Sequence, residues 1–224
     1  GKGKAAVQRA PGEPPAAQFA DVGAGFENGL PYTAWGRQVR DERKGNNSKD
    51  NPDANCKPLG FMQLHTHPYE KKIVQGNGTI VIMYNANNDV RQILTNGQEL
   101  PKVGPDLAPW FYGYSVGKWE DDHTLVINTV GVSDATWLDK AGHPHSIDAK
   151  IEERYTRPDH NHLQMTVTVT DPKVFTKPFV LSKNDYRWVP DQESEEQMCV
   201  PSEMINYMKL ISDPAFGVTN DPTK

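Results

Sequence analysis

The chain has 224 residues, of which 36% are hydrophobic and 24% are charged, and its formal net charge is -5. This length suits one large β domain or one domain with extensions, and the low hydrophobic share predicts a modest core with many loops. An acidic chain without a basic tract argues against nucleic acid as a partner. No segment approaches the roughly 18 apolar residues of a membrane span.

Residues 1–30 are rich in Ala, Gly and Pro and have no apolar period. This composition predicts an extended segment that becomes ordered only where it docks, on its own domain or on a neighbouring subunit. We therefore expect a homo-oligomer or other assembly held through this segment. The chain starts at Gly1 without an initiator Met or an apolar signal region, as expected of a processed, exported protein or of a trimmed chain.

Residues 31–70 form a lead-in of helix and loop. A short helix is predicted over 33–44, with Thr33 as its N-cap and Gly45 near its end. Cys56 and Cys199 are the two cysteines. In an oxidising compartment they would form one disulfide that stabilises the fold by ~4–5 kcal/mol. The alternative is two reduced cysteines in a cytosolic protein. The absence of a CxxCH motif excludes a covalently attached c-type haem.

Residues 71–200 change to an apolar period of two, which is typical of β-strands. Asn96-Gly97 predicts a tight hairpin turn. We predict an all-β domain, an antiparallel meander of about eight strands closed as a lipocalin-like barrel, because closure hides the edge strands. A two-sheet β-sandwich is the alternative. In the C-terminal segment 201–224, a short helix is expected near 201–211. The expected strands lie in KKIVQ, TIVIMYN, VRQILT, YGYSVGKW, TLVINTV, SIDAKIEERYTR, LQMTVTVT and PFVLSKNDYRWV.

Six of the seven histidines occur in pairs separated by one residue. On a strand, such a pair would aim both imidazoles the same way, which suits two ligands of one Zn or Cu ion. The pair at 160 and 162 lies in a predicted turn, where exposure to solvent is the simpler interpretation, and His123 is expected at the surface. The metal-ligand candidates are therefore His65, His67, His143 and His145. The alternative is that these imidazoles bond to backbone and carboxylate groups.

The loop 136–146 gathers Trp137, Asp139, His143, His145 and Ser146. Loops on a rigid scaffold often carry binding residues. A Ser-His-Asp triad is disfavoured because no strand–elbow–helix context surrounds the serine. We expect Asp139 to orient an imidazole and Trp137 to contact a ligand.

Alternation in SIDAKIEERYTR places Glu153 on the same face as Ile151 and Tyr155, which is the face expected to point inward. A buried carboxylate is costly unless it is paired, and Arg91 and Arg187 are the candidate partners. One interpretation is a structural ion pair or exposure at the barrel rim. The other is a ligand anchor or a catalytic group, with Glu153, Asp139 and His145 as the catalytic set and Arg91, Trp137 and Arg187 as ligand contacts.

Several stretches resemble a family of uncharacterised, secreted bacterial proteins over roughly residues 55–200. They are KKIVQ, RQILTNGQELP, GYSVGKWEDDHTLVINTVG, TWLDKAGHPHS, IEERYTR and TVTDPKVFTKPF. The resemblance implies a secreted or periplasmic protein with a lipocalin-like β-barrel, and it implies no particular reaction. The family motif also contains the positions of His67 and His145, whereas His65, His143 and His160 are less typical of it.

Three functions follow as hypotheses. The first, which we favour, is a non-enzymatic module for binding or self-assembly through the N-terminal segment. The second is a Cu- or Zn-binding protein or enzyme that uses the histidine pairs. The third is a metal-free enzyme acting on a small molecule or glycan, which requires Glu153 to face a cavity and not to be sealed in an ion pair.

Overall fold

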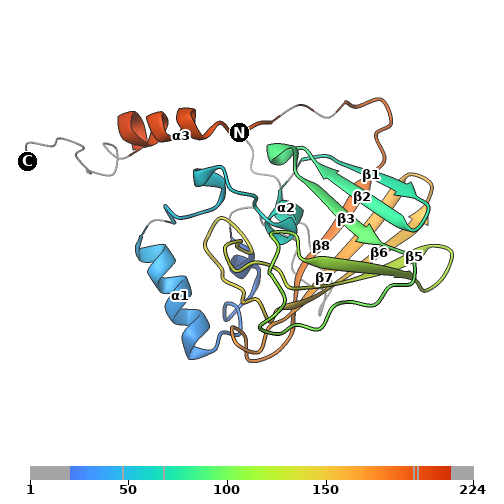
Figure 1. Cartoon of the computed structure of the whole chain (residues 1–224), viewed down its shortest axis with the longest axis horizontal. Coiled ribbons are helices and arrows are strands. Elements are labelled where there is room, and N and C mark those ends of the chain that lie inside the picture. The colour runs from blue at the N-terminus through green and yellow to red at the C-terminus, as the bar shows by residue number, and fades with distance from the viewer. Residues whose placement is uncertain (1–20, 47, 68, 194, 196, 213–224) are drawn as a thin grey trace, which may run out of the picture.

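A computed structural model describes residues 21–46, 48–67, 69–193, 195 and 197–212. Its main feature is one eight-stranded sheet, in the order β1 to β8, that curls into a half-barrel (Figure 1). The prediction of an all-β fold with about eight strands is confirmed, and the two-sheet sandwich is wrong because all eight strands share one sheet. The strands are β1 Lys71–Gly76, β2 Thr79–Tyr84, β3 Val90–Leu94, β4 Tyr114–Trp119, β5 Thr124–Val130, β6 Lys150–Asp159, β7 His162–Thr170 and β8 Phe179–Arg187.

Neighbouring strands are antiparallel except β3 and β4, which meet in a parallel bridge between Leu94 and Val116. The hairpin predicted at Asn96-Gly97 is therefore wrong. A parallel neighbour requires the chain to return to the same end of the sheet, and residues 95–113 make that return. The backbone N–H of Thr95 donates to the Gly78 carbonyl at 2.9 Å, so this stretch lies beside the β1–β2 turn.

The two ends of the sheet, β1 and β8, lie close to each other at one point. The Nζ of Lys71 on β1 donates to the Tyr186 hydroxyl on β8 at 2.8 Å. Within the described strands, β1 pairs only with β2 and β8 only with β7. Side chains, and not a backbone ladder, therefore connect the two edges in this half-barrel.

The predicted helices near residues 33–44 and 201–211 are present. Helix α1 (Ala34–Gly45) begins at Thr33, whose hydroxyl accepts from the Gly36 N–H at 3.1 Å. Helix α3 (Pro201–Tyr207) continues as a π turn, η4 (Met208–Ser212), and lies outside the curl of the sheet (Figure 1). The predicted disulfide between Cys56 and Cys199 is confirmed and ties α3 to the lead-in. No helix in the described part of the chain is long and apolar enough to cross a membrane.

Helix α2 (Phe61–Thr66) was not predicted, and all six of its residues are buried. It lies inside the curl, where Phe61 contacts Arg91 of β3 and the His65 carbonyl accepts from Asn184 of β8. His65 belongs to this helix and His67 is its C-cap. The two imidazoles of HTHP are therefore not side by side on a strand. The single-turn segments are η1 Val22–Gly25, η2 Asp53–Asn55 and η3 Ala86–Asn88.

One hydrophobic core joins the lead-in and the sheet. Val22 and Leu30 from the N-terminal segment, together with α2, pack against the inward side chains of the strands. The described part of the N-terminal segment, residues 21–30, thus contributes to the core of its own chain. The remainder of the segment, on which the docking prediction mainly rests, lies outside the described residues.

Candidate functional site

The loop between β5 and β6 folds back on itself and brings Asp139 next to His143. Gly142 takes a left-handed backbone conformation with φ +88°, which suits a glycine at this turn. The Asp139 carboxylate accepts from the backbone N–H of His143 at 3.2 Å, and the N–H of Leu138 donates to the His143 carbonyl at 2.9 Å. Local backbone bonding therefore fixes the position of the imidazole.

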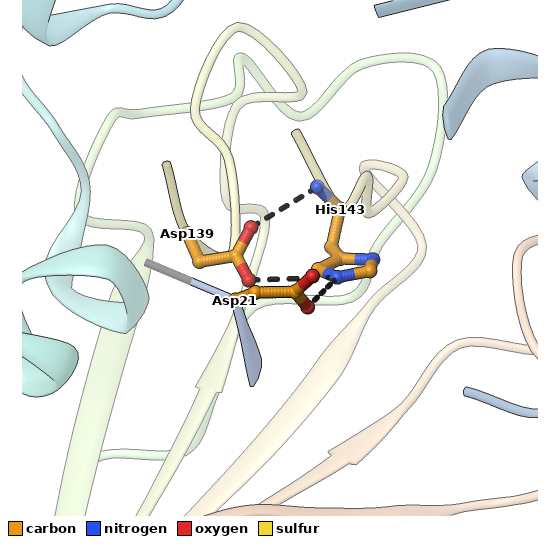
Figure 2. Close-up of side chains that lie close together, drawn as sticks. All are labelled: Asp21, Asp139 and His143. Atoms are coloured by element: carbon orange, nitrogen blue, oxygen red, sulfur yellow. Dashed lines mark hydrogen bonds and ion pairs between the residues drawn. The ribbon is translucent and has the colours of Figure 1, made fainter. Parts of the chain in front are cut away.

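Asp21 reaches this loop from the other end of the sequence. It is the N-cap of η1, and the next residue, Val22, donates its N–H to Asp139 Oδ2 at 2.6 Å. The Nε2 atom of His143 lies 2.7 Å from Asp21 Oδ1 and 3.6 Å from Asp139 Oδ2. Figure 2 shows the three side chains pointing toward one another. We call Asp21, Asp139 and His143 the Asp21 cluster.

The two carboxylates of this cluster differ in their electrostatics. Burial raises the pKa of Asp139, although the charge of His143 and the N–H groups of Val22 and His143 oppose this effect. Burial also acts to raise the pKa of Asp21, but the hydrogen bond from His143 and its charge bring it below the usual value. Among the described residues, His143 is the only basic side chain within ion-pair distance of either acid, and Arg40 and Arg43 act on Asp21 and Asp139 from further away. The cluster is therefore rich in negative charge.

Tyr32 and Gly23 complete the surroundings of the imidazole. The Tyr32 hydroxyl contacts His143 Nδ1, and burial raises the pKa of Tyr32, so its phenol stays protonated. A Cβ atom on Gly23 would lie only 2.9 Å from His143 Nε2 and Cε1. The glycine therefore leaves room beside the nitrogen that faces the two carboxylates. A pocket of about 220 Å³ opens here and is lined by Asp21, Gly23, Ala24, Asn28, Gly29, Leu30, Tyr32, Arg37 and His143.

The donor set of the Asp21 cluster fits a divalent transition-metal ion. One ligand atom from each residue lies within 4.8 Å of the others. Two ligands of one tetrahedral ion with ~2.1 Å bonds are about 3.4 Å apart. The separation between His143 Nε2 and Asp139 Oδ2 already has this size, and Asp21 Oδ1 would need to move away by less than an ångström. Imidazole with carboxylates suits Zn and related divalent ions.

Glu153, Arg91 and His65 form a second cluster, the Glu153 cluster, inside the half-barrel. Arg91 donates to both carboxylate oxygens, at 2.9 and 2.5 Å, and His65 Nε2 lies 2.7 Å from Oε1. The Tyr155 hydroxyl also donates to Oε1, at 3.2 Å. Arg91 further bonds to the hydroxyls of Ser115 and Thr129. All three side chains of the cluster are fully buried. The predicted inward orientation of Glu153 and its pairing with Arg91 are confirmed.

Charge is balanced within the Glu153 cluster. Burial acts to raise the pKa of Glu153, but the charge of Arg91 and the hydrogen bond from His65 hold it well below its usual range. Burial lowers the pKa of His65 to about 4, against the attraction of Glu153. The imidazole is therefore neutral near pH 7 and donates through Nε2. The third hypothesis required Glu153 to face a cavity, and both of its carboxylate oxygens are instead occupied by protein donors.

The predicted catalytic set of Glu153, Asp139 and His145 does not form one site. Asp139 bonds to Val22 and His143, whereas His145 is buried with its Nε2 atom 2.8 Å from Thr136 Oγ1 and its Nδ1 atom donating to the Ser146 carbonyl. Burial lowers the pKa of His145, so it packs as a neutral side chain. Asp139 does orient an imidazole, but it is that of His143.

The predicted metal site of four histidines is also not formed. Within the described ranges, the one group of three or more ligands close enough for an ion is the Asp21 cluster, which contains His143 but not His65, His67 or His145. The reason is that His65 and His67 belong to α2 and its cap, where side chains two residues apart diverge. Burial lowers the pKa of His67 to about 4, with the charge of Lys140 in support.

The predicted ligand contacts also lie apart. Arg91 is engaged by Glu153, and Trp137 is buried under the Arg43 guanidinium, whose carbon lies 4.5 Å from the ring centroid. Arg187 is exposed at the end of β8.

The sequence signal that was missed is Asp21 in DVGAG, an acidic N-cap before a glycine-containing turn within the low-complexity segment. No protein-family model, curated protein or solved structure matches this chain.

Proposed function

We propose that this protein binds a divalent transition-metal ion through Asp21, Asp139 and His143. The observation that carries the proposal is the convergence of two carboxylates and one imidazole beside a pocket. No Arg or Lys of the described residues lies within ion-pair distance of either acid, and Arg40 and Arg43 act on Asp21 and Asp139 only from further away. The ion would bind to His143 Nε2, and the Nδ1–H group would then donate to the Tyr32 hydroxyl. Such a hydrogen bond from the second ring nitrogen commonly orients an imidazole that binds a metal. The buried charge of Asp139 would gain a directly bound counter-ion, in addition to His143 at 3.6 Å and the more distant Arg43.

We also propose that the protein is exported and that its half-barrel closes as a lipocalin-like barrel. The disulfide supports an oxidising compartment, and the resemblance to secreted bacterial proteins supports export to the periplasm or beyond. The lipocalin-like closed barrel remains a proposal that the contact between Lys71 and Tyr186 supports. Assembly through the N-terminal segment is a second proposal, and it concerns mainly residues outside the described ranges. Light scattering that finds a monomer at working concentrations would end it.

The metal proposal is tested by calorimetry and elemental analysis on protein first treated with a chelator. We expect one Zn²⁺, Mn²⁺ or Cu²⁺ ion to bind per chain and to stabilise the fold by about 2.7 kcal/mol at a hundredfold excess over Kd. Gly23→Ala should abolish binding although all three ligands remain, because its methyl group would occupy the space beside Nε2. His143→Asn should abolish it as well.

His162→Gln is the matched control, because His162 pairs with Asp159 at the surface at 2.8 Å but lacks a second carboxylate. This variant should bind the ion as the unmodified protein does. Absence of stoichiometric binding to any of the three ions would refute the metal function. Binding that is unchanged in both Gly23→Ala and His143→Asn would show that the ion sits elsewhere.

A further inference from the structure

Lys71 has an unusual position at the point where the two edges of the half-barrel meet. It begins β1 and is paired with Tyr84 on β2, so the two side chains share the inner face of the sheet. Its Nζ donates to the Tyr186 hydroxyl on β8 at 2.8 Å. The amine therefore spans the two edge strands from inside the curl.

The partners of this amine are aromatic and neutral. Nζ lies 4.7 Å from the centroid of the Tyr186 ring and 5.8 Å from that of Tyr84. No carboxylate oxygen of a described residue lies within 4.0 Å of it. The acid inside the curl is Glu153, and its oxygens are already bonded by Arg91, His65 and Tyr155. A charged ammonium here has two ring faces and one hydroxyl as partners and no carboxylate of the described residues in direct contact.

The electrostatics agree with this geometry. Burial lowers the pKa of Lys71 to about 7, and the attraction of Glu153 opposes the effect only in part. A substantial share of the side chain is therefore the neutral amine near neutral pH, which is the nucleophilic form. The other ionisable groups that face this region are His65 on α2, Tyr84 on β2, Arg91 on β3, Glu153 and Tyr155 on β6, and Tyr186 on β8.

We propose that Lys71 is a reactive amine that condenses with small aldehydes or ketones, with the Tyr186 hydroxyl as its proton relay. The Nζ lone pair attacks the carbonyl carbon, and the C=O π electrons move to the oxygen, which takes the proton of Tyr186. The nitrogen then returns a proton to the phenolate. Loss of water from this carbinolamine forms the C=N bond of an imine, so the step needs no oxidant or reductant.

The surroundings also select the class of carbonyl compound. The Lys71 side chain is only partly buried, and Ile73, two residues along on the same face, is 44% exposed. A carbonyl compound can therefore approach along an apolar surface that ends at two tyrosine rings. This favours a short, uncharged aldehyde or ketone with an apolar substituent over a sugar or an anionic keto acid.

The test traps the imine by reduction in the unmodified protein. Acetaldehyde and cyanoborohydride are added near neutral pH in the presence of a chelator, and ethylated lysines are mapped by tandem mass spectrometry. Lys72 is the matched control, because it is adjacent in sequence but exposed on the opposite face of β1. We expect Lys71 to be ethylated about tenfold faster than Lys72 at early times, because a desolvated amine is more often in its neutral, nucleophilic form.

Two further measurements separate a reactive site from mere accessibility. Labelling of Lys71 should level off above its pKa of about 7, where the amine is fully deprotonated. Tyr186→Phe keeps the ring and removes the relay, so it should slow labelling at Lys71 and leave Lys72 unchanged. Labelling of Lys71 no faster than that of Lys72 in the folded protein would overturn the proposal, as would equal rates at Lys71 with and without the Tyr186 hydroxyl.

Discussion

The Glu153 cluster and the Asp21 cluster are built from the same groups, a buried carboxylate and an imidazole, but they differ in how charge is balanced. Arg91 neutralises Glu153 with two direct bonds inside the half-barrel. From the described residues, Asp139 has only backbone N–H groups and an imidazole in direct contact, with Arg43 further away. The first arrangement is complete without a ligand. The second leaves a buried negative charge beside a pocket, which is why we assign structure to one and cation binding to the other.

The largest effect should come from breaking the Glu153 cluster. Glu153→Gln leaves the Arg91 guanidinium buried without its counter-charge, and we expect a loss of about 3–5 kcal/mol in the free energy of unfolding. Glu152→Gln, on the exposed face of the same strand, should cost less than about 0.5 kcal/mol. Both values come from urea denaturation. Similar losses in the two variants would mean that the ion pair does not hold the half-barrel together.

The pairing of Glu153 with Arg91 was predictable because both side chains follow the alternation of their strands. The same alternation predicted the eight strands, and the cap at Thr33 predicted α1. These signals are local, since each is read from neighbouring residues, and local rules governed these elements in the folded protein. The disulfide was predictable only because two cysteines allow a single pairing.

The parts that were missed depend on contacts between distant residues. Helix α2 has six residues, all buried, including Gln63, His65 and Thr66, so no polar face revealed its helical period. The parallel contact of β3 with β4 is set by the long return of residues 95–113, not by the turn signal at Asn96-Gly97. Asp21 and His143 are separated by 122 residues in sequence, and no spacing pattern could join them.

An intermediate effect is expected from His65 as the pH falls. Because burial lowers its pKa to about 4, the unfolded chain takes up a proton from pH 6.5 downward while the folded chain does not. The contribution of His65 to the free energy of unfolding is therefore fully present above pH 6.5 and is lost as the pH falls. This loss should reach about 2–3 kcal/mol by pH 4. His65→Gln should remove this share of the acid sensitivity, measured by urea denaturation across the range.

His162→Gln is the control for loss of a histidine at the surface, and it should change the free energy of unfolding at pH 7 by less than about 0.5 kcal/mol. If His65→Gln and the unmodified protein lose stability in parallel between pH 6.5 and 4, the imidazole in the Glu153 cluster is not held neutral. The comparison of the two clusters would then lose one of its supports.

The smallest effect should come from Asp139→Asn measured with a chelator present. The Asn amide keeps one acceptor but turns its NH₂ group toward the N–H of Val22 or His143, which costs about 1–3 kcal/mol. Removal of a buried charge offsets part of this cost. We therefore expect the free energy of unfolding to fall by about 1 kcal/mol near pH 7. Because burial raises the pKa of Asp139, the folded protein protonates this carboxylate at a higher pH than the unfolded chain does. The unmodified protein therefore gains stability from this group as the pH falls toward about 4, and the variant does not.

The deficit of Asp139→Asn should consequently grow in acid, which is opposite in sign to the effect of His65→Gln. Asp134→Asn, at an exposed acid of the same loop, is the control for the substitution and should change the free energy of unfolding at pH 7 by less than about 0.5 kcal/mol. The deficit is the difference in free energy of unfolding between the unmodified protein and the variant at each pH. The contribution of His65 is the same in both proteins and therefore cancels. A deficit that shrinks toward acid would mean that Asp139 is already stabilised as an anion by His143 alone, and the Asp21 cluster would then need no cation, like the Glu153 cluster.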